Sequence, residues 1–591
     1  MTIAVIAITE AGAETARSIV AALPGAALHG RVDRVRGADI AFAETTGHLR
    51  SLFAQGIPII GVCAAGILLR AVAPLLADKT AEPPVLAVSP DGASVVPLLG
   101  GHHGANRLAL TLAKALGGHA AITTAGDVAL GLALDEPPEG WHLANPEAAK
   151  PVAAALLAGE PVRLEVEAGE AGWLSSPHLG DAGELGIRVT DHEVEGDQEL
   201  IYHPPVLALG VGCERGCDPA ELSALAHQTL DEAGLSAGAV ALVVSLDLKA
   251  DEPAVHALAV ALGVPARFFP AAELEAQAPR LLTPSDVVFN ETGCHGVAEG
   301  AALAAVGPEG ELVVAKAKSA RATCAVAKAL SIDIAKAGRP RGRLFIVGIG
   351  PGEALWRTPE ASRAVSLSSD VVGYALYLDL LGEALSGKIR HDGQMGAEEA
   401  RARQALDLAS EGRTVSLVCS GDPGIYALAT LVFELMDKEA RPAWNRLDIT
   451  VVPGISALQA AAARAGAPIN HDFCTISLSD LLTPWEVILR RVQAAAEGDF
   501  VVAFYNPVSQ RRRDQLPAAR DILLTRRPAT TPVILARNLG RPGETVEVIT
   551  LAELDPARVD MLTVVLVGNS ETRHTASGWV YTPRGYAKKW E

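Results

Sequence analysis

Short runs of β-branched and aliphatic residues alternate along this chain with Ala- and Leu-rich stretches of helical pattern. The runs are typical of buried strands, and their alternation with helical stretches indicates parallel α/β layers. In residues 1–130 we expect strands at 3–8, 57–62 and 120–124, and a helix at 105–116. The alternation begins again at VLALGVGCERG (206–216) and after residue 343. The pattern therefore predicts a multidomain α/β protein.

The length of 591 residues agrees with several domains, because roughly 150 residues per domain gives about four. We expect one domain over 1–130 and another over 204–334. Between them, the Pro-, Gly- and Glu-rich residues 131–203 predict a small, looser middle segment. The stretch AKAGRPRGR at 335–343 has the composition of a linker.

Charge separates the chain into two parts. The whole chain has a formal net charge of -19, but residues 341–591 carry 28 Lys and Arg against 29 Asp and Glu. The first 340 residues carry 22 against 40, a net of -18. This asymmetry suggests two halves of different origin. An acidic chain also offers few cations for phosphate contacts, so we expect no nucleic-acid partner.

Cysteine usage and the apolar stretches bear on location. Seven cysteines, an odd number, are scattered along the chain, so we expect no disulfide framework and a cytoplasmic protein. The start, MTIAVIAITEAG, lacks a basic region and reads as a strand rather than a signal peptide. The apolar stretch 57–77 carries Arg70 near its middle, which favours a strand, turn and helix over a membrane span.

A glycine-rich turn follows the apolar run in IVGIGPGEALWRTPEA (346–361). A Rossmann fingerprint would need glycine where Glu353 stands, and the Gly-Lys-Ser/Thr of a Walker A loop is absent. Two further strand-to-helix turns follow, SGDP (420–423) and PGIS (453–456). Ligands bind at the carboxyl ends of strands in α/β sheets. Because the loops contain no Lys/Arg cluster for a triphosphate, we expect a nucleoside-like cofactor.

The three loops together resemble the tetrapyrrole methylases, which use S-adenosylmethionine, and the resemblance covers residues 343–591. Four stretches are similar to the members that methylate precorrin-3B at carbon 17 in cobalamin biosynthesis: HDFCTISLSDLLTPWEVI (471–488), FYNPVSQRRRDQL (504–516), VDMLTVVLVGNSET (559–572) and TPRGY (582–586). Glu353 and Ala427 are small departures, where the family usually has Asp and Gly. The resemblance implies lobes at 344–456 and 457–591, a tetrapyrrole substrate and a homodimer formed through these lobes.

The resemblance also implies which residues contact S-adenosylmethionine in a cleft between the lobes. The matching positions are Pro351, Ser420, Gly421, Asp422, Ile425, Tyr426, Ser456, Ala457, Tyr505 and Asn538. Asp422 is suited to accept hydrogen bonds from ligand hydroxyls or an amine, or else it caps a helix. The Tyr426 ring either stacks on the cofactor or packs against protein.

Transfer of a methyl group needs an in-line approach, so positioning and water exclusion supply most of the acceleration. In this family the step accompanies ring contraction, which needs proton transfers. His471, Asp472 and Asp480 cluster in one stretch and are our catalytic candidates, the alternative being a surface turn with a capping Asp. We favour Asp480, because the hydroxyls of Ser477 and Ser479 are placed to hold its carboxylate. Three arginines, 511–513, are candidates for binding substrate carboxylates, or they form a solvated helix face.

The first half resembles the cobalt-precorrin-5A hydrolases, over 50–127 and 206–328. There His102 would be the base toward a lactone, in the loop GGHHGAN (100–106), which is one residue shorter than usual in that family. The shorter loop leaves open a non-catalytic module that binds or channels a tetrapyrrole. For the second half, the alternative interpretation is a methylase of the same fold that acts on another corrinoid. Cys213 and Cys217, with Cys294 and His295, are the residues that suggest zinc, but the Cys-x₃-Cys spacing is loose, so we expect no metal.

Overall fold

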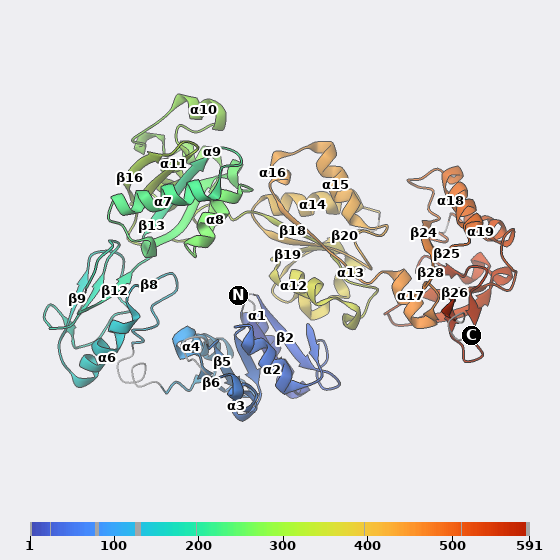
Figure 1. Cartoon of the computed structure of the whole chain (residues 1–591), viewed down its shortest axis with the longest axis horizontal. Helices are drawn as coiled ribbons and strands as arrows, with labels where there is room; N and C mark the ends of the chain where they lie inside the picture. Colours follow the sequence, from blue (N-terminus) through green and yellow to red (C-terminus); the bar gives the residue numbers. More distant parts are fainter. Residues whose placement is uncertain are drawn as a thin grey trace. The chain divides into compact units, whose positions relative to one another are not determined.

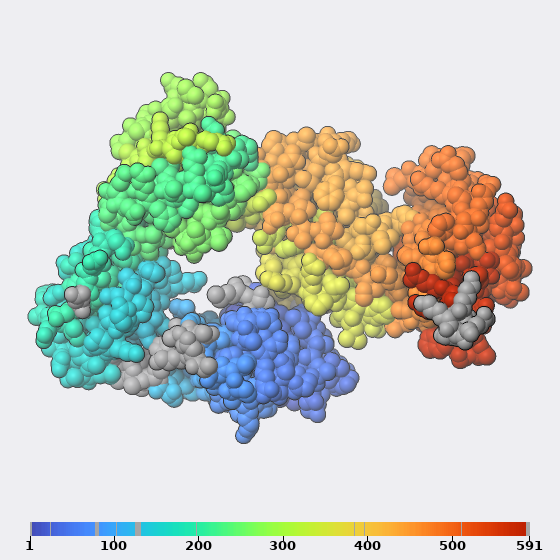
Figure 2. All heavy atoms as spheres, in the orientation of Figure 1, coloured from blue at the N-terminus to red at the C-terminus, as the bar shows by residue number. Residues whose placement is uncertain are grey.

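The strands of the described residues form six sheets (Figure 1). The computed structural model describes residues 3–23, 25–76, 82–123, 132–196, 198–394, 396–509 and 511–586; Figure 2 draws the others in grey. The chain divides into two compact units, residues 1–344 with 406–414 and 440–448, and residues 345–405, 415–439 and 449–591. Within the described part of the chain, no helix is long and apolar enough to cross a membrane.

The first sheet, blue in Figure 1, has the strand order β3-β2-β1-β4-β5-β6-β7. Its strands are β1 (Ile3–Ala7), β2 (Ala26–Arg31), β3 (Ile40–Phe42), β4 (Ile59–Val62), β5 (Val85–Val88), β6 (Ser94–Leu99) and β7 (His119–Ala120). Its helices are α1 (Glu10–Ala22), α2 (Thr45–Ala54), α3 (Ala65–Val72) and α4 (Ala105–Leu116). Neighbours pair in parallel except β5 and β6, which are antiparallel because a short turn joins them.

Most of the elements predicted for this region are confirmed. The strands expected at 3–8 and 57–62 are β1 and β4, and the helix expected at 105–116 is α4. Residues 57–77 fold as β4 followed by α3, as the charge of Arg70 suggested. Only the first residue of the strand expected at 120–124 is found in a strand, since β7 ends at Ala120. Residue 124 lies outside the described residues.

The middle segment has its own sheet and core, so the prediction of a looser segment is wrong. The strand order is β10-β9-β11-β12-β8. The elements are β8 (His142–Leu143), α6 (Ala149–Ala158), β9 (Val162–Val166), β10 (Leu179–Gly180), β11 (Gly186–Val189) and β12 (Glu199–His203). Fully buried Tyr202 contacts the rings of Trp141 and Trp173 edge-on and donates a hydrogen bond to the Leu134 carbonyl. Several strands are very short, which hides them from a periodicity analysis.

The third sheet, green in Figure 1, has the order β15-β14-β13-β17-β16. Its strands are β13 (Leu207–Cys213), β14 (Val240–Leu246), β15 (Ala266–Phe269), β16 (Glu311–Lys318) and β17 (Ala322–Lys328). Its helices are α7 (Pro219–Glu232), α8 (Pro253–Ala261), α9 (Ala271–Glu275), α10 (Asp286–Thr292) and α11 (Val297–Val306). The sheet is mixed, because β17 pairs antiparallel with both β13 and β16.

The expected linker at 335–343 is anchored by hydrogen bonds along its length. The backbones of Arg339 and Phe268 exchange two hydrogen bonds, and Arg267 donates to the carbonyls of Ala335, Ala337 and Gly338. After Pro340 the partners change, because Arg341 donates to the carbonyls of Arg446 and Leu447. The segment therefore has two ordered parts that meet at Pro340.

The fourth sheet has the order β20-β19-β21-β18-β22. Its strands are β18 (Arg343–Gly348), β19 (Asp370–Tyr374), β20 (Ile389–Gly393), β21 (Thr414–Cys419) and β22 (Asp448–Val452). Its helices are α12 (Pro359–Leu367), α13 (Ala375–Asp379), α14 (Glu398–Ser410), α15 (Leu428–Glu439) and α16 (Pro442–Asn445). Strands β21, β18 and β22 are neighbours, and each of them precedes one of the three predicted ligand loops.

The remaining chain, orange to red in Figure 1, forms a five-stranded sheet, β24-β25-β28-β26-β27, and a small sheet, β23-β30-β29. Its strands are β23 (Gly466–Ala467), β24 (Phe473–Ser477), β25 (Val501–Tyr505), β26 (Pro532–Arg537), β27 (Thr545–Thr550), β28 (Thr563–Val567), β29 (Arg573–His574) and β30 (Val580–Tyr581). Its helices are α17 (Ala457–Ala465), α18 (Trp485–Glu497) and α19 (Gln515–Leu524). Strand β28 pairs antiparallel with β25 and β26, so this lobe is also mixed.

Candidate functional site

Glycines bring the three loops of the fourth sheet into direct contact. A Cβ at Gly454 would lie 2.1 Å from the Gly421 carbonyl oxygen and 2.7 Å from the Gly348 carbonyl oxygen. A Cβ at Gly348 would likewise lie 2.5 Å from the Gly421 oxygen. No real Cβ tolerates such distances, so only glycine allows the three backbones to pack this closely.

The first loop also needs glycine for its conformation. Gly350 adopts a left-handed φ of 75°, and its backbone exchanges two hydrogen bonds with Gly421 at 2.8 and 3.3 Å. Gly352 packs against the loop that follows β26, where an added Cβ would lie 2.1 Å from the Gly540 carbonyl oxygen. The loop at 348–352 is therefore held from both lobes of the second compact unit.

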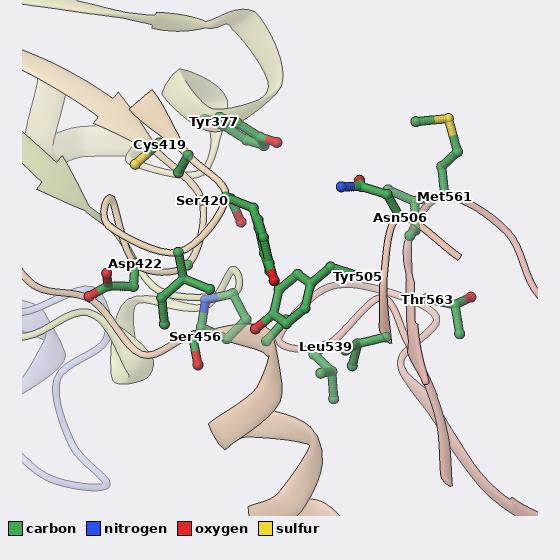
Figure 3. A pocket seen from close by; sticks show the side chains of 18 of the residues that line it. Tyr377, Cys419, Ser420, Asp422, Ser456, Tyr505, Asn506, Leu539, Met561 and Thr563 are labelled. Carbon is green, nitrogen blue, oxygen red and sulfur yellow. The ribbon is translucent and has the colours of Figure 1, made fainter. Parts of the chain in front are cut away.

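A cavity of about 310 Å³ opens beside these loops (Figure 3). All ten positions that the sequence resemblance assigned to the cofactor line this cavity. It is also lined by residues not predicted, among them Tyr377, Glu398, Arg401, Asn506, Arg541 and Met561. In Figure 3, Ser420, Asp422 and Ser456 lie on one side, and Asn506, Met561 and Thr563 lie on the other. The structure thus brings together residues from both predicted lobes.

Asp422 holds two of the loops together. Its Oδ1 accepts a hydrogen bond from the Gly424 amide at 2.8 Å, and its Oδ2 accepts one from the Gly454 amide at 3.1 Å. Helix α15 does not begin until Leu428, so the alternative that Asp422 caps this helix is wrong. The carboxylate retains lone pairs for a ligand while it joins the second loop to the third.

Two tyrosines form one wall of the cavity. The rings of Tyr426 and Tyr505 lie 5.2 Å apart and are tilted by 52°. The Tyr426 hydroxyl donates to the Thr475 carbonyl at 2.9 Å, and the ring remains half exposed. The Tyr505 hydroxyl accepts a hydrogen bond from the Leu458 amide at 3.0 Å, in the first turn of α17. Tyr426 therefore packs against protein and still presents an accessible ring to the cavity.

Backbone strain is concentrated at this cavity. Of the non-glycine residues with positive φ in the described chain, Tyr426 (52°), Asn506 (49°) and Asn538 (51°) all line it. Such conformations cost energy and persist only where the surrounding contacts enforce them, which happens often at functional sites. Asn506 is fixed in this way by a bond from its Nδ2 to the Ser477 hydroxyl at 3.1 Å.

Arg541 is the main cavity residue that sequence reasoning missed. It follows β26, and its Nε donates to the Pro351 carbonyl at 2.8 Å while its Nη2 donates to the Ser420 hydroxyl at 2.9 Å. Its guanidinium lies 5.8 Å from the centre of the Tyr377 ring. The residue stands within RNLGRPGE, a charged stretch between strands whose pattern gives no sign that its side chain reaches the first two loops.

The three catalytic candidates do not form the expected cluster. His471 and Asp472 precede β24, whereas Asp480 follows it, and a five-residue strand spans about 17 Å. The Asp472 carbonyl accepts a bond from Val501, the first residue of β25, whereas the cavity is lined by Tyr505 at the far end of that strand. His471 and Asp472 thus lie at the end of β24 away from the cavity, and Asp480 follows the end nearer to it; a catalytic role for His471 or Asp472 stays a prediction.

Asp480 is not held by the serines as expected. Its carboxylate accepts a bond from the Gln515 amide at 3.1 Å and lies 3.9 Å from the Arg512 guanidinium. The Ser477 hydroxyl instead accepts from Asn506, and the Ser479 hydroxyl accepts from Arg512. Asp480 is not among the residues that line the cavity. Its catalytic role stays a prediction.

Arg512 is buried and serves the fold. Besides Ser479 it binds the Asn506 carbonyl at 2.8 Å, and so joins the ends of β24 and β25. Its neighbour Arg511 is exposed, and so is Arg513. The predicted cluster of three arginines therefore has at most two side chains accessible to a substrate.

In the first half, the backbone of His102 lies in a 3-10 helix, Gly101–His103, whose flanking Gly100 and Gly104 are left-handed. The His102 side chain lies outside the described residues. Elsewhere in this region His29 is buried, and its Nδ1 lies 2.8 Å from Nε2 of His48. Burial, and then the charge of His48, lower the pKa of His29 to about 3.

The cysteines considered for zinc lie in the third sheet region as free thiols. Burial raises the pKa of Cys213 to about 11, which disfavours the thiolate that a metal needs. His295 is engaged with the Glu275 carboxylate at 2.9 Å. Among the residues the structure covers, no group of three His, Cys, Asp or Glu side chains is arranged to hold a metal ion.

Three family profiles match the chain. Residues 343–555 match the family described as Tetrapyrrole (Corrin/Porphyrin) Methylases. Residues 47–127 match Cobalamin synthesis G N-terminal, and residues 207–327 match Cobalamin synthesis G C-terminus. The profiles thus coincide with the two regions in which the sequence resemblance was found.

The chain is also similar to individual proteins. The chain is 42% identical over 267 residues to the cobalamin biosynthesis protein CobIJ of Mycobacterium tuberculosis, covering 43% of this chain and 51% of that protein. It therefore spans about half the length of that relative. A crystal structure of the methyltransferase CobJ is 42% identical in sequence, with a TM-score of 0.39. The match covers 41% of this chain and 100% of that chain.

A precorrin-3B C(17)-methyltransferase of Sinorhizobium sp. is 46% identical over 250 residues, which are 42% of this chain and 98% of that protein. A relative matched at this identity over nearly its whole length shares its fold and family. Ahead of its second half the chain has two segments that match the Cobalamin synthesis G profiles, and through that second half it belongs to the tetrapyrrole (corrin/porphyrin) methylase family.

Proposed function

We propose that the second half of the chain catalyses S-adenosylmethionine-dependent methylation of precorrin-3B at carbon 17, with contraction of the ring. The observation that carries this proposal is that all ten residues assigned to the cofactor line one cavity, at the meeting point of three glycine loops. The name of the Sinorhizobium relative supports the choice of substrate and carbon.

The cavity fits the cofactor by size and by chemistry. A volume of about 310 Å³ lies within the range of small-molecule sites. The glycines at 348, 421 and 454 let the three loops pack closely beside the cavity, and Asp422 offers acceptors for hydroxyls or an amine. S-adenosylmethionine supplies a methyl group on a sulfonium, whose transfer to a ring carbon leaves S-adenosylhomocysteine.

The residues of this chain would contribute mainly by position. The bonds of Asp422 and Arg541 fix the three loops before a ligand arrives, so little order is lost on binding. The rings of Tyr426 and Tyr505 exclude water from one side of the cavity. Asp480, at the same edge of the sheet, is the chain's candidate for moving a proton during ring contraction.

The test is turnover of the full chain with S-adenosylmethionine and either precorrin-3B or cobalt-factor III, since relatives carry both substrate names. Mass spectrometry should show a product heavier by one methyl group with at least one of the two. The variant Gly454→Ala, whose Cβ would collide with the Gly421 carbonyl, should lose this activity. Absence of a methylated product from both substrates would contradict the proposal. Methylation of a different corrinoid would keep the reaction class but change the proposed substrate.

For the first half we propose opening of the cobalt-precorrin-5A lactone, on the basis of its two cobalamin synthesis G segments. The alternative is a module that binds a tetrapyrrole without reacting. Release of acetaldehyde from cobalt-precorrin-5A by the full chain would support hydrolysis. Tight binding of the pigment without release would support the module instead.

We further propose that the chain acts in the cytoplasm as a homodimer formed through the methylase half, and that its domains meet near residues 130, 203, 334–344 and 456. Light scattering of the purified full chain measures the oligomeric state. A monomer at micromolar concentration would contradict the dimer. Limited proteolysis followed by mass spectrometry should place the first cuts near these boundaries.

A further inference from the structure

Four charged side chains line the cavity: Glu398, Arg401, Asp422 and Arg541. Arg401 is buried and paired with the Glu398 carboxylate at 3.1 Å. Asp422 is satisfied in part by two backbone amides. Glu398 and Arg401 therefore neutralise each other, whereas Asp422 is held by neutral amides.

Arg541 differs from Arg401, the other cation of this cavity, because its hydrogen-bond partners are neutral. They are the Pro351 carbonyl and the Ser420 hydroxyl, with the Tyr377 ring 5.8 Å away, and no described carboxylate forms an ion pair with the guanidinium. Burial lowers the pKa of Arg541, yet an arginine remains charged at neutral pH. A partly buried cation without an anion is costly, and a bound carboxylate would offset that cost.

The geometry of the guanidinium suits a carboxylate. Five N–H groups are available to an arginine, and the two hydrogen bonds engage only Nε and one hydrogen of Nη2. This leaves Nη1 and the second hydrogen of Nη2, which form the outer fork that binds a carboxylate through two parallel bonds. The two bonds to the loops hold that fork in a fixed orientation.

We propose that Arg541 is the carboxylate-binding residue of this cavity. The inference rests on the proposed function, which supplies two sources of the group. One is the amino-acid carboxylate of S-adenosylmethionine, and the other is a carboxylate side chain of the tetrapyrrole. Arg541 would then act twice, since it joins the first two loops and recognises the anion that enters beside them.

Calorimetric binding to the full chain tests this, with S-adenosylmethionine and its decarboxylated form, which differ only by the carboxylate. If the carboxylate is the cofactor's, Arg541→Gln should weaken binding of S-adenosylmethionine by about 10- to 100-fold more than binding of the decarboxylated form, whose smaller loss measures the support that Arg541 gives to the loops. Arg541→Lys, which keeps charge but not the fork, should give a smaller loss. Arg537→Gln is the matched control, because Arg537 is exposed, outside the cavity and paired with Asp560.

If the carboxylate is the tetrapyrrole's, Arg541→Gln should lower both cofactor affinities equally, through the loss of the loop bonds, and raise the KM for precorrin-3B about 10-fold or more at saturating S-adenosylmethionine. Equal losses for S-adenosylmethionine and its decarboxylated form, together with an unchanged KM for precorrin-3B, would overturn the proposal and reduce Arg541 to a support of the loops. No change in any of the three would also overturn it. A wild-type chain that binds neither cofactor form would instead contradict the proposed function itself.

Discussion

Replacement of Asp422 by alanine should separate the loops at the cavity. The change removes the acceptors of two hydrogen bonds, from the Gly424 and Gly454 amides. The Gly424 amide is exposed, so water replaces its lost partner at little cost. The Gly454 amide is partly buried against the Gly421 and Gly348 backbones, where water has little access.

The magnitude follows from the second bond. Leaving a partly buried donor without a partner costs about 1–2 kcal/mol. If S-adenosylmethionine binds only while the loops are joined, this cost appears as an affinity lower by about 5- to 30-fold. The methylase half should become less stable by a similar amount, because the same bond is lost from the folded state.

The assay is calorimetric titration of S-adenosylhomocysteine into wild-type chain and Asp422→Ala, together with thermal denaturation. Asp555→Ala is the matched control, since Asp555 also accepts one amide bond, from Ala557 at 2.7 Å, but at an exposed turn away from the cavity. The control should keep full affinity. Unchanged affinity in a folded Asp422→Ala chain would refute the reasoning that joined loops make the site.

Three further predictions concern other parts of the chain. Asp480→Asn should lower turnover by about 10²–10⁴-fold with unchanged cofactor affinity, whereas His471→Ala, at the opposite sheet edge, should leave turnover unchanged; equal effects would remove Asp480 from proton transfer. Burial lowers the pKa of His29 to about 3, so below about pH 6.5 this histidine binds a proton in the unfolded chain but not in the folded chain. The local free energy of unfolding should therefore fall by up to roughly 1.4 kcal/mol for each pH unit below that value. Hydrogen exchange of β2 and α2, corrected for intrinsic rates, should show this loss of stability. If His29→Gln leaves the change of local stability with pH unaltered, the prediction is contradicted. A chain beginning at Arg341 should fold and bind S-adenosylhomocysteine, because the hydrogen-bond partners of the linker change at Pro340; an insoluble fragment would show that the first half supports the second.

Much of the fold was predictable from the sequence because buried strands leave continuous apolar runs. β1, β4 and α4 appear where the pattern placed them. The mixed sheets were not predictable in this way, since antiparallel pairs such as β16 with β17 depend on short turns rather than on strand composition. The middle segment was missed because strands of two to five residues leave too little periodicity.

Some residues of the candidate site were predicted from the sequence and others were not, and the difference has a physical reason. The glycine loops are local features, so Gly421, Asp422 and Ser456 stand out in the sequence and converge on one cavity. Arg541 acts at long range, reaching Pro351 across 190 residues, and no local pattern marks it. The proximity of His471 to Asp480 in sequence was misleading, because a strand between them carries the two to opposite edges of a sheet.

The most direct test of the proposed methylation is the fate of a carbon-13-labelled methyl group. The full chain is incubated with precorrin-3B and S-adenosylmethionine labelled at the methyl carbon, and the product is examined by carbon-13 NMR. We expect one new methyl signal, coupled to carbon 17 of a contracted ring. A label attached to any other carbon, or none transferred, would contradict the proposed function.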